Sequence, residues 1–218
     1  MTPDEWLLYH RIRFTYHPKR AVVWLRICRY LQPYVFAEEP LLELGAGYGD
    51  FLRFIQAKEK WALDWHEALA AYWGPEVRPL LQSALEPIPL PAASLGTVLA
   101  SNFFEHFTIG ESEAILKEVA RVLRPGGRLI AIQPDFGLEP GRYFDDYTHK
   151  TVFTGPGFCD FLQALGWRIV RLEPRFLPFS MKSRLPKAGW LVALYLALPW
   201  RPLAGQFLAV AEAPGRTV

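Results

Sequence analysis

The sequence predicts an α/β fold in which helices cover both faces of a doubly wound, mostly parallel sheet of seven strands. From residue 41 onward, short apolar runs alternate with segments of helical periodicity. A turn with three glycines separates the first apolar run from the first helical segment. In addition, 51% of the 218 residues are apolar, which is enough to build one sizeable core. We therefore expect one main domain.

Strands and helices are expected to alternate along most of this domain. We expect strands at residues 41–44, 61–63, 77–81, 97–101, 128–133, 167–172 and 206–211, and helices at 50–57, 67–72, 111–123 and 157–165. Pro79 weakens the third strand, because proline lacks a backbone donor. Arg124-Pro125-Gly126-Gly127 is a stop signal for the helix before it. Alternation of this kind is typical of a parallel sheet.

Two segments lie outside the alternation. Residues 3–33 are expected to form two helical segments that break at His17-Pro18, and the second has one apolar face. Such a cap could cover a substrate site or only protect a face of the sheet. Residues 174–205 hold five prolines and a short apolar helix at 190–198. We expect a helical cap at 1–36 and the main domain at 37–218, with 174–205 inserted between its last two strands.

Composition excludes several classes of protein. A net charge of +2 gives no basis for nucleic-acid binding. Cys28 and Cys159 lie far apart, so neither a zinc site nor a disulfide framework is indicated. The N-terminus lacks the pattern of a signal peptide, and residues 190–200 are about half the length of a membrane span. We expect a cytoplasmic monomer or homodimer without a transmembrane segment, with peripheral membrane contact left open.

The glycine turn at residues 45–49 is the first candidate binding site. Ligands of open parallel sheets bind at the carboxyl ends of the strands, where the strand order reverses. The dinucleotide pattern G-x-G-x-x-G would need a glycine at position 50, where Asp50 stands. Glu43, just before the turn, is unfavourable for a pyrophosphate and suits a ligand with an amino group.

From Glu43 to Gly49 the chain resembles the first motif of class I methyltransferases that use S-adenosylmethionine. The likeness extends in order over residues 41–133, through Asp64, Gln82-Ser83-Ala84-Leu85, Ser101-Asn102-Phe103-Phe104-Glu105-His106 and the stretch 121–127. It implies a Rossmann-like sheet with an antiparallel last strand, and S-adenosylmethionine as the cofactor. The implied cofactor-binding residues are Glu43, Gly45, Ala46, Gly47, Tyr48, Gly49, Asp64, Trp65, Ser83, Ala84, Leu85 and Asn102.

The resemblance also implies individual roles. Asp64 would accept hydrogen bonds from both ribose hydroxyls. Ser83 stands where the family often has an aspartate that contacts the adenine, so that contact would come from Ser83 or from backbone N–H groups. Four stretches resemble a narrower set of bacterial methyltransferases of unassigned substrate, which implies no further chemistry: His17-Pro18-Lys19-Arg20, residues 47–51, residues 144–149 and Arg175-Phe176-Leu177-Pro178.

Candidate catalytic residues lie on loops after the fourth and fifth strands. His106 could deprotonate an acceptor hydroxyl, or it could merely satisfy backbone groups at the start of a loop. His149 has Asp145 and Asp146 just before it, and a carboxylate could orient its imidazole. Alternatively the aspartates cap the next helix and His149 is solvated. Asp135 could contact the acceptor or form a turn beside Pro134.

A basic run accompanies the apolar helix of the insertion: Arg175, Lys182, Arg184 and Lys187. It could bind an anionic acceptor or a lipid surface, but a solvated loop is the simpler interpretation. The carboxylates show no spacing typical of metal ligands, so we predict a reaction without a metal.

The leading hypothesis is a methyltransferase that acts on a small-molecule or glycan-like acceptor, at oxygen. A second hypothesis is a protein that binds S-adenosylmethionine or S-adenosylhomocysteine in a regulatory, non-catalytic role. A third is a nicotinamide-dependent oxidoreductase, which the position of Asp50 argues against. The catalytic residues predicted for the leading hypothesis are His149, His106 and Asp146.

Overall fold

The computed structural model describes residues 8–9, 12, 15–178 and 188–215. Within them lies one seven-stranded sheet of order β3-β2-β1-β4-β5-β7-β6. Its strands are β1 (Pro40–Leu44), β2 (Glu59–Asp64), β3 (Val77–Leu81), β4 (Leu95–Ser101), β5 (Leu123–Pro134), β6 (Arg168–Leu177) and β7 (Gln206–Glu212). β7 is antiparallel to both of its neighbours, whereas the other described pairs are parallel. The predicted fold class is confirmed.

The strand order reverses between β1 and β4. β1 pairs with β2 on one side and with β4 on the other. After β1 the chain adds β2 and β3 on the first side, and it then crosses to the second side to form β4 and β5. Leu41 to Leu44 pair in register with Thr97 to Ala100. The segments that follow β1, β2, β3 and β4 therefore emerge at the same edge. A ligand of this sheet is expected at that edge.

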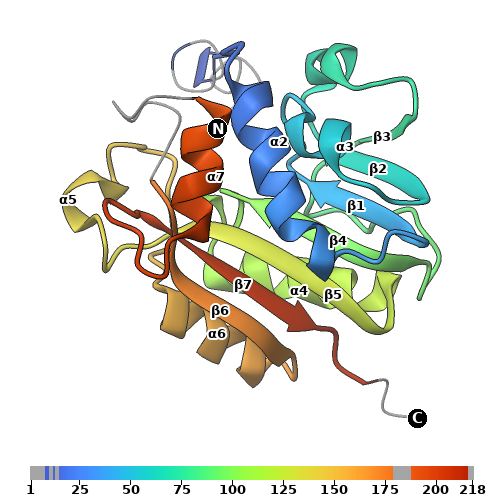
Figure 1. Ribbon diagram of the computed structural model, residues 1–218. Helices are drawn as coiled ribbons and strands as arrows, with labels where there is room; N and C mark the ends of the chain where they lie inside the picture. Colours follow the sequence, from blue (N-terminus) through green and yellow to red (C-terminus); the bar gives the residue numbers. More distant parts are fainter. Residues whose placement is uncertain (1–7, 10–11, 13–14, 179–187, 216–218) are drawn as a thin grey trace.

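Helices cover both faces of the sheet (Figure 1). The helical elements are α2 (Arg20–Leu31), η1 (Gln32–Tyr34), α3 (Asp50–Phe54), η2 (Glu67–Tyr72), η3 (Phe104–His106), α4 (Ile109–Val122), α5 (Pro140–Tyr143), α6 (Gly155–Ala164) and α7 (Gly189–Ala197). α4 and α6 pack on one face, and α2, α3 and α7 on the other. The helical segment expected before residue 17 lies mostly outside the described residues.

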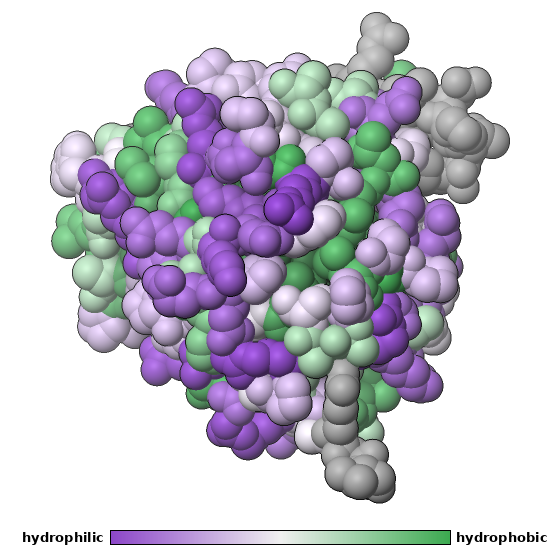
Figure 2. Space-filling model, turned by 90° about the vertical axis from the view of Figure 1, so that its right-hand side faces the viewer, coloured by the Kyte–Doolittle hydropathy of each residue, from purple (hydrophilic) through white to green (hydrophobic). Residues whose placement is uncertain are grey.

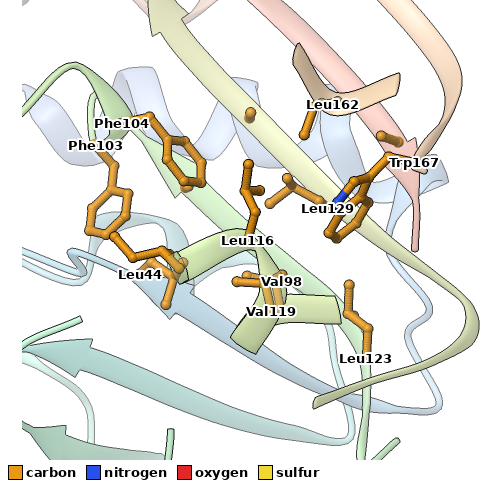
Figure 3. Close-up of a cluster of buried hydrophobic side chains, with 14 of the residues drawn as sticks. Leu44, Val98, Phe103, Phe104, Leu116, Val119, Leu123, Leu129, Leu162 and Trp167 are labelled. Carbon is orange, nitrogen blue, oxygen red and sulfur yellow. The ribbon is translucent and has the colours of Figure 1, made fainter. Parts of the chain in front are cut away.

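The core is divided by the sheet into two layers. On the α4 and α6 side, Leu44, Val98 and Leu129 from the strands meet Leu116 and Val119 from α4 (Figure 3). Leu41 and other buried residues belong to the opposite layer, under α2 and α3. The central strands β4 and β7 are buried along almost their whole length, as expected for strands that are covered on both faces.

Local chemistry sets the element ends. Thr108 and Glu111 form a reciprocal capping box at the start of α4, two residues earlier than predicted. Thr154 caps α6. The stretch 124–127 ends α4 but also opens β5, where Gly126 has a φ of 70° and the register against β4 shifts. The prediction missed this because a bulged strand start contains the same glycines as a turn.

α7 and β6 account for the described part of the 174–205 segment. β6 continues to Leu177, five residues beyond the prediction, and α7 packs against α2. Lys182, Arg184 and Lys187 lie outside the described residues. No helix in the described chain is long and apolar enough to cross a bilayer. The side of the molecule where β1, β2 and β3 lie is mostly hydrophilic, with apolar residues in separate patches (Figure 2).

Candidate active site

The glycine turn after β1 adopts a backbone that glycine permits and other residues rarely adopt. Gly45, Gly47 and Gly49 have φ values of 63°, 53° and 69°. A Cβ on Gly45 would lie 2.8 Å from Phe103 Cδ2, and one on Gly49 would lie 2.6 Å from Trp73 Cδ1. The turn is fixed to β2 because the backbone N–H groups of Gly45 and Ala46 both donate to Leu63 O, at 2.8 and 3.2 Å.

A group of buried carboxylates lies next to this turn. Glu43 and Asp64 are 4% and 6% exposed, and Asp50 is 6% exposed. Arg20 of α2 donates from Nε to Asp50 Oδ2 at 2.6 Å. Burial raises the pKa of Glu43 well above its usual value, and Asp50 and Asp64 raise it further, whereas Arg20 lowers it. Glu43 Oε2 is buried and has no hydrogen-bond partner among the described residues. This arrangement suits a cationic ligand group.

Asp64 links the ends of β1 and β2. Its Oδ2 accepts from the backbone N–H of Gly47 at 2.9 Å, and its Oδ1 accepts from that of His66 at 3.0 Å. Each oxygen keeps a second lone pair, so the predicted acceptance of ribose hydroxyls is compatible with these bonds. Trp65, the next residue, is 39% exposed and presents a flat apolar surface beside Asp64.

The segments after β3 and β4 complete the same edge. Ser83 Oγ accepts from the backbone N–H of Leu85 at 3.2 Å, which fixes the Ser83-Ala84-Leu85 turn. Asn102 follows β4 in a left-handed conformation with a φ of 48°, and its Oδ1 accepts from Gln206 Nε2 at 2.6 Å. The tertiary structure therefore gathers the predicted cofactor residues at the carboxyl edge of β1 to β4.

Tyr48 has a different environment from the glycines around it. Its ring contacts Tyr72 and Tyr16, with ring centroids 4.9 and 5.3 Å away, and the guanidinium of Arg20 lies 5.6 Å from its centre. The sequence did not indicate Tyr16, Arg20 or Tyr72 as neighbours of the turn. They are separated from it along the chain, and only the packing of the cap and of the segment after β2 brings them there.

His106 lies at the end of a hydrogen-bonded chain. Tyr9 donates from its hydroxyl to Asp146 Oδ2 at 2.8 Å, and Thr148 donates from its hydroxyl to Asp146 Oδ1 at 2.6 Å. His106 Nδ1 lies 2.9 Å from Thr148 Oγ1. Because the Thr148 hydroxyl proton is directed to Asp146, Thr148 Oγ1 accepts and His106 Nδ1 carries the proton. His106 Nε2 then holds the lone pair.

Glu105 and His149 lie beside His106. A nitrogen of each histidine and a carboxylate oxygen of Glu105 all lie within 4.8 Å of one another. Burial, and then His149, lower the pKa of His106 to about 4, and burial raises the pKa of Glu105 to about 8. Near neutral pH, the His106 imidazole is therefore neutral, with its one proton on Nδ1, and the Glu105 carboxyl is protonated to a large extent. The sequence did not single out Glu105 except as the neighbour of His106.

The other predicted acidic residues do not join this histidine cluster, which we define as Glu105, His106 and His149. Asp145 is exposed and lies 3.9 Å from Arg142. Asp146 orients His106 through Thr148, and its backbone carbonyl accepts from the backbone N–H of His149 at 3.2 Å. Asp135 accepts from the backbone N–H groups of Gly137 and Gly155, at 2.8 and 2.9 Å, so it acts as a turn former.

The histidine cluster and the glycine turn are neighbours. The ring of Phe103 occupies the space next to Gly45 where a Cβ would otherwise lie. Phe103 comes directly before η3, which contains Glu105 and His106. The loop that carries His149 is tied to η3 because the backbone N–H of Lys150 donates to Glu105 O at 2.7 Å. The fold thus places the glycine turn, with its buried carboxylates, and the half-buried histidine cluster along one edge of the sheet.

This combination of fold and turn is that of a class I methyltransferase. Residues 42–131 match the family model described as a methyltransferase domain. The chain carries a class I S-adenosylmethionine-dependent methyltransferase domain, as predicted, and its cofactor is S-adenosylmethionine. No curated protein sequence matches the chain.

Solved structures share the fold over nearly the whole chain. A SAM-dependent methyltransferase from Archaeoglobus fulgidus has a TM-score of 0.68 and 20% identity, and the match covers 95% of this chain and 99% of that one. One from Aquifex aeolicus has a TM-score of 0.59 and 18% identity, over 98% and 99% of the two chains. One from Methanosarcina mazei has a TM-score of 0.63 and 14% identity, over 86% and 98%. At these identities the likeness concerns the fold.

The site residues fit the cofactor. S-adenosylmethionine carries an ammonium group and a sulfonium, and Glu43 offers a buried oxygen without a partner on the inner side of the turn. The left-handed glycines leave the backbone of the turn open to close approach. The contacts of individual residues with the cofactor are predictions and belong to the proposed function.

Proposed function

We propose that this protein transfers a methyl group to an oxygen of a small-molecule or glycan-like acceptor. The observation that supports it best is the histidine cluster next to the glycine turn, in which Glu105 is buried, both histidines are half-buried, and the His106 Nε2 lone pair is unprotonated at neutral pH. An amine acceptor can react through its own lone pair once it is neutral, whereas a hydroxyl must lose a proton. A base near the methyl donor is therefore chiefly useful for oxygen.

The proposed cofactor contacts follow the geometry of the turn. Glu43 accepts the ammonium group, Gly45 to Gly49 pack against the amino-acid end, and Asp64 accepts the ribose hydroxyls beside Trp65. The adenine lies against the Ser83-Ala84-Leu85 turn, and Asn102 closes the site from β4. Tyr48 takes part through the packing of the turn rather than as an isolated contact.

The proposed reaction is an in-line displacement. The bound cofactor supplies a methyl group on an already activated sulfonium, so no metal is required to activate the donor. The acceptor oxygen forms a bond to the methyl carbon, the carbon–sulfur bond breaks with its electron pair going to sulfur, and the hydroxyl proton passes to His106 Nε2. Thr148 and Asp146 hold the His106 tautomer that can accept it. His149, on the loop after α5, lies beside His106 and helps to keep it neutral by lowering its pKa.

The proposed setting is the cytoplasm, with no nucleic acid as substrate. The net charge of +2 provides no basic field that would attract a polyanion. α7 exposes apolar side chains: Trp190 is 67% exposed and Leu194 is 55% exposed. A second copy of the protein or a lipid surface would make contact at this helix.

Calorimetry and a transfer assay test the proposal together. We expect micromolar binding of S-adenosylhomocysteine, no binding of NAD, and transfer of labelled methyl to a hydroxyl acceptor in a panel that also contains matched amines. His106→Ala should lower kcat by about 10²-fold or more with unchanged S-adenosylhomocysteine affinity, because only a proton acceptor is removed. His17→Ala is the matched control, since His17 is exposed and lies outside both the histidine cluster and the proposed cofactor contacts.

Two results would contradict the proposal. Methylation of the amines alone would exclude oxygen as the target. Cofactor binding with no transfer to any acceptor, and cellular function that survives loss of His106 and His149, would favour the regulatory alternative.

A further inference from the structure

The histidine cluster has the composition of a metal site. Two imidazoles and one carboxylate are the protein ligands of many catalytic zinc and non-haem iron centres, which keep further coordination positions open. Here the three side chains come from η3 and from the loop after α5, and their candidate ligand atoms lie within 4.8 Å of one another. The sequence did not reveal this set, because residues 105, 106 and 149 form no ligand motif along the chain.

His106 is already oriented as a ligand would be. Its Nδ1–H donates to Thr148 Oγ1 at 2.9 Å, and Thr148 is in turn held by Asp146. Metal-bound histidines commonly donate their other ring N–H to such a partner, which fixes the tautomer and the ring direction. His106 Nε2 is therefore the coordinating atom, and it lies 3.9 Å from Glu105 Oε1.

Glu105 supplies a second, independent observation. Its side chain is 1% exposed, and its Oε2 is buried without a hydrogen-bond partner among the described residues. A buried carboxyl oxygen without a partner is unfavourable, and coordination of a cation is one way to satisfy it. No lysine or arginine is paired with Glu105 in the described ion pairs.

We propose that Glu105, His106 and His149 bind a divalent transition-metal ion, with Zn²⁺ as the first candidate. Bonds of about 2.0–2.2 Å to each ligand place the ligand atoms about 3.4 Å apart in a tetrahedral site. The present separations would close by roughly an ångström, which rotation of the side chains can provide. This proposal revises the sequence-based prediction of a reaction without a metal.

The role of the ion in catalysis rests on the proposed function. With the ion bound, His106 Nε2 would be a ligand and could not accept the proton, so the ion would take over activation of the acceptor by lowering the pKa of a hydroxyl in the open position. In that case Glu105 and the two histidines would hold the ion, and the proton would leave to solvent or to a basic group of the acceptor. Binding of the ion itself depends only on the cluster.

Metal binding can be measured without any acceptor. Protein stripped with a chelator and dialysed is titrated calorimetrically with ZnCl₂, and separately with CoCl₂ while the visible absorption of Co²⁺ is recorded. We expect one equivalent to bind, with Co²⁺ absorption of a nitrogen- and oxygen-ligated site. Glu105→Gln and His149→Ala should each weaken Zn²⁺ binding by at least 100-fold, and Thr148→Ala by about 10- to 100-fold. His66→Ala is the control and should bind unchanged.

The outcomes separate the two proposals. S-adenosylhomocysteine binding is measured on the same samples. If neither Zn²⁺ nor Co²⁺ binds while S-adenosylhomocysteine does, the metal site is overturned and the proposed function stands. If Zn²⁺ binding is unaffected by Glu105→Gln and His149→Ala, both shown folded by circular dichroism, the ion binds elsewhere and the site is overturned. Metal binding that depends on the cluster without methyl transfer supports the site and counts against the proposed function.

Discussion

Glu43 shows how one side chain can determine the charge of a proposed binding site. It lies in β1 with its carboxyl group buried next to Asp50 and Asp64, and Arg20 provides the opposing charge. Burial and the two neighbouring carboxylates disfavour its ionised form, whereas a bound ammonium would favour it. The residue is therefore expected to change its protonation when the cofactor binds.

Cofactor binding should release a proton from Glu43. The pKa of the carboxyl is raised in the free protein, and an ammonium at Oε2 lowers it, so the bound state holds fewer protons and binding tightens as the pH rises. Titration with S-adenosylhomocysteine at pH 6 in phosphate and in Tris, two buffers of different ionisation enthalpy, measures this release. Glu43→Gln should abolish the buffer dependence. Equal enthalpies in both buffers for the unmodified protein would show that Glu43 does not titrate on binding.

At the scale of elements, α7 is joined to the sheet by buried polar contacts. Arg201 donates from Nη1 to Glu173 Oε2 at 2.6 Å and from Nη2 to Leu196 O at 2.8 Å. Tyr30 of α2 donates to Glu173 Oε1 at 2.6 Å. These contacts join α2, β6, α7 and the segment before β7. They explain how a short helix with exposed apolar residues keeps a defined position.

Breaking this buried pair should destabilise the fold. The Glu173 and Arg201 side chains are both 8% exposed, and Arg201→Met would leave Glu173 buried with only Tyr30 and the 52% exposed Arg171 as partners. Because Arg171 still offsets part of the charge, we expect a loss of about 2–3 kcal/mol in the free energy of unfolding, measured by urea denaturation. Arg168→Gln is the control, because Arg168 is 69% exposed and its pairing with Glu212 should contribute under about 1 kcal/mol. A similar loss for both variants would contradict the buried-pair explanation.

The same network gives a pH dependence of stability. Burial raises the pKa of Glu173, but hydrogen bonds from Tyr30 and Arg201 outweigh burial and lower it below its usual value. Because the folded-state pKa is lowered, the contribution is present above the unfolded value of about 4.3 and is lost as the pH falls through the folded-state value. Urea midpoints measured from pH 6 to pH 3 should fall more in the unmodified protein than in Glu173→Gln. Parallel curves would refute this assignment.

At the scale of the whole molecule, the proposed cofactor site joins both halves of the sheet. The glycine turn follows β1, Asp64 ends β2 and Asn102 follows β4, so a ligand there bridges strands on either side of the reversal in strand order. The two core layers meet across these same strands. A ligand at this edge is therefore coupled to the stability of the entire domain.

S-adenosylhomocysteine should stabilise the protein as one unit. At a concentration of 100 times Kd, binding to the folded state alone adds about 2.7 kcal/mol to the free energy of unfolding. For a chain of this length that corresponds to a rise in Tm of roughly 5–10 °C. The fluorescence of the eight tryptophans provides the measurement, and NAD at equal concentration is the control. An equal rise with NAD, or none with S-adenosylhomocysteine, would contradict the assigned cofactor.

Much of the fold could be predicted because its signals are local. Apolar runs bounded by glycine and proline mark the strands, so the strand Val77–Leu81 was predicted at its observed bounds. The spacing of Gly45, Gly47 and Gly49 indicated a tight turn, and the structure shows that all three adopt the left-handed backbone that few other residues adopt. Ends that depend on pairing with another strand, such as the start of β5 at Leu123, were placed too late.

The amino-acid sequence by itself determined the class of fold and the cofactor, and it predicted the glycine turn as the binding site, because these depend on residues that are close along the chain. Only the tertiary structure decided which polar groups surround His106. Tyr9 and Asp146 are separated by 137 positions, and His106 and Thr148 by 42. No local pattern predicts which of these polar groups will be buried together, because burial and pairing depend on how the cap, η3 and the loop after α5 pack against one another.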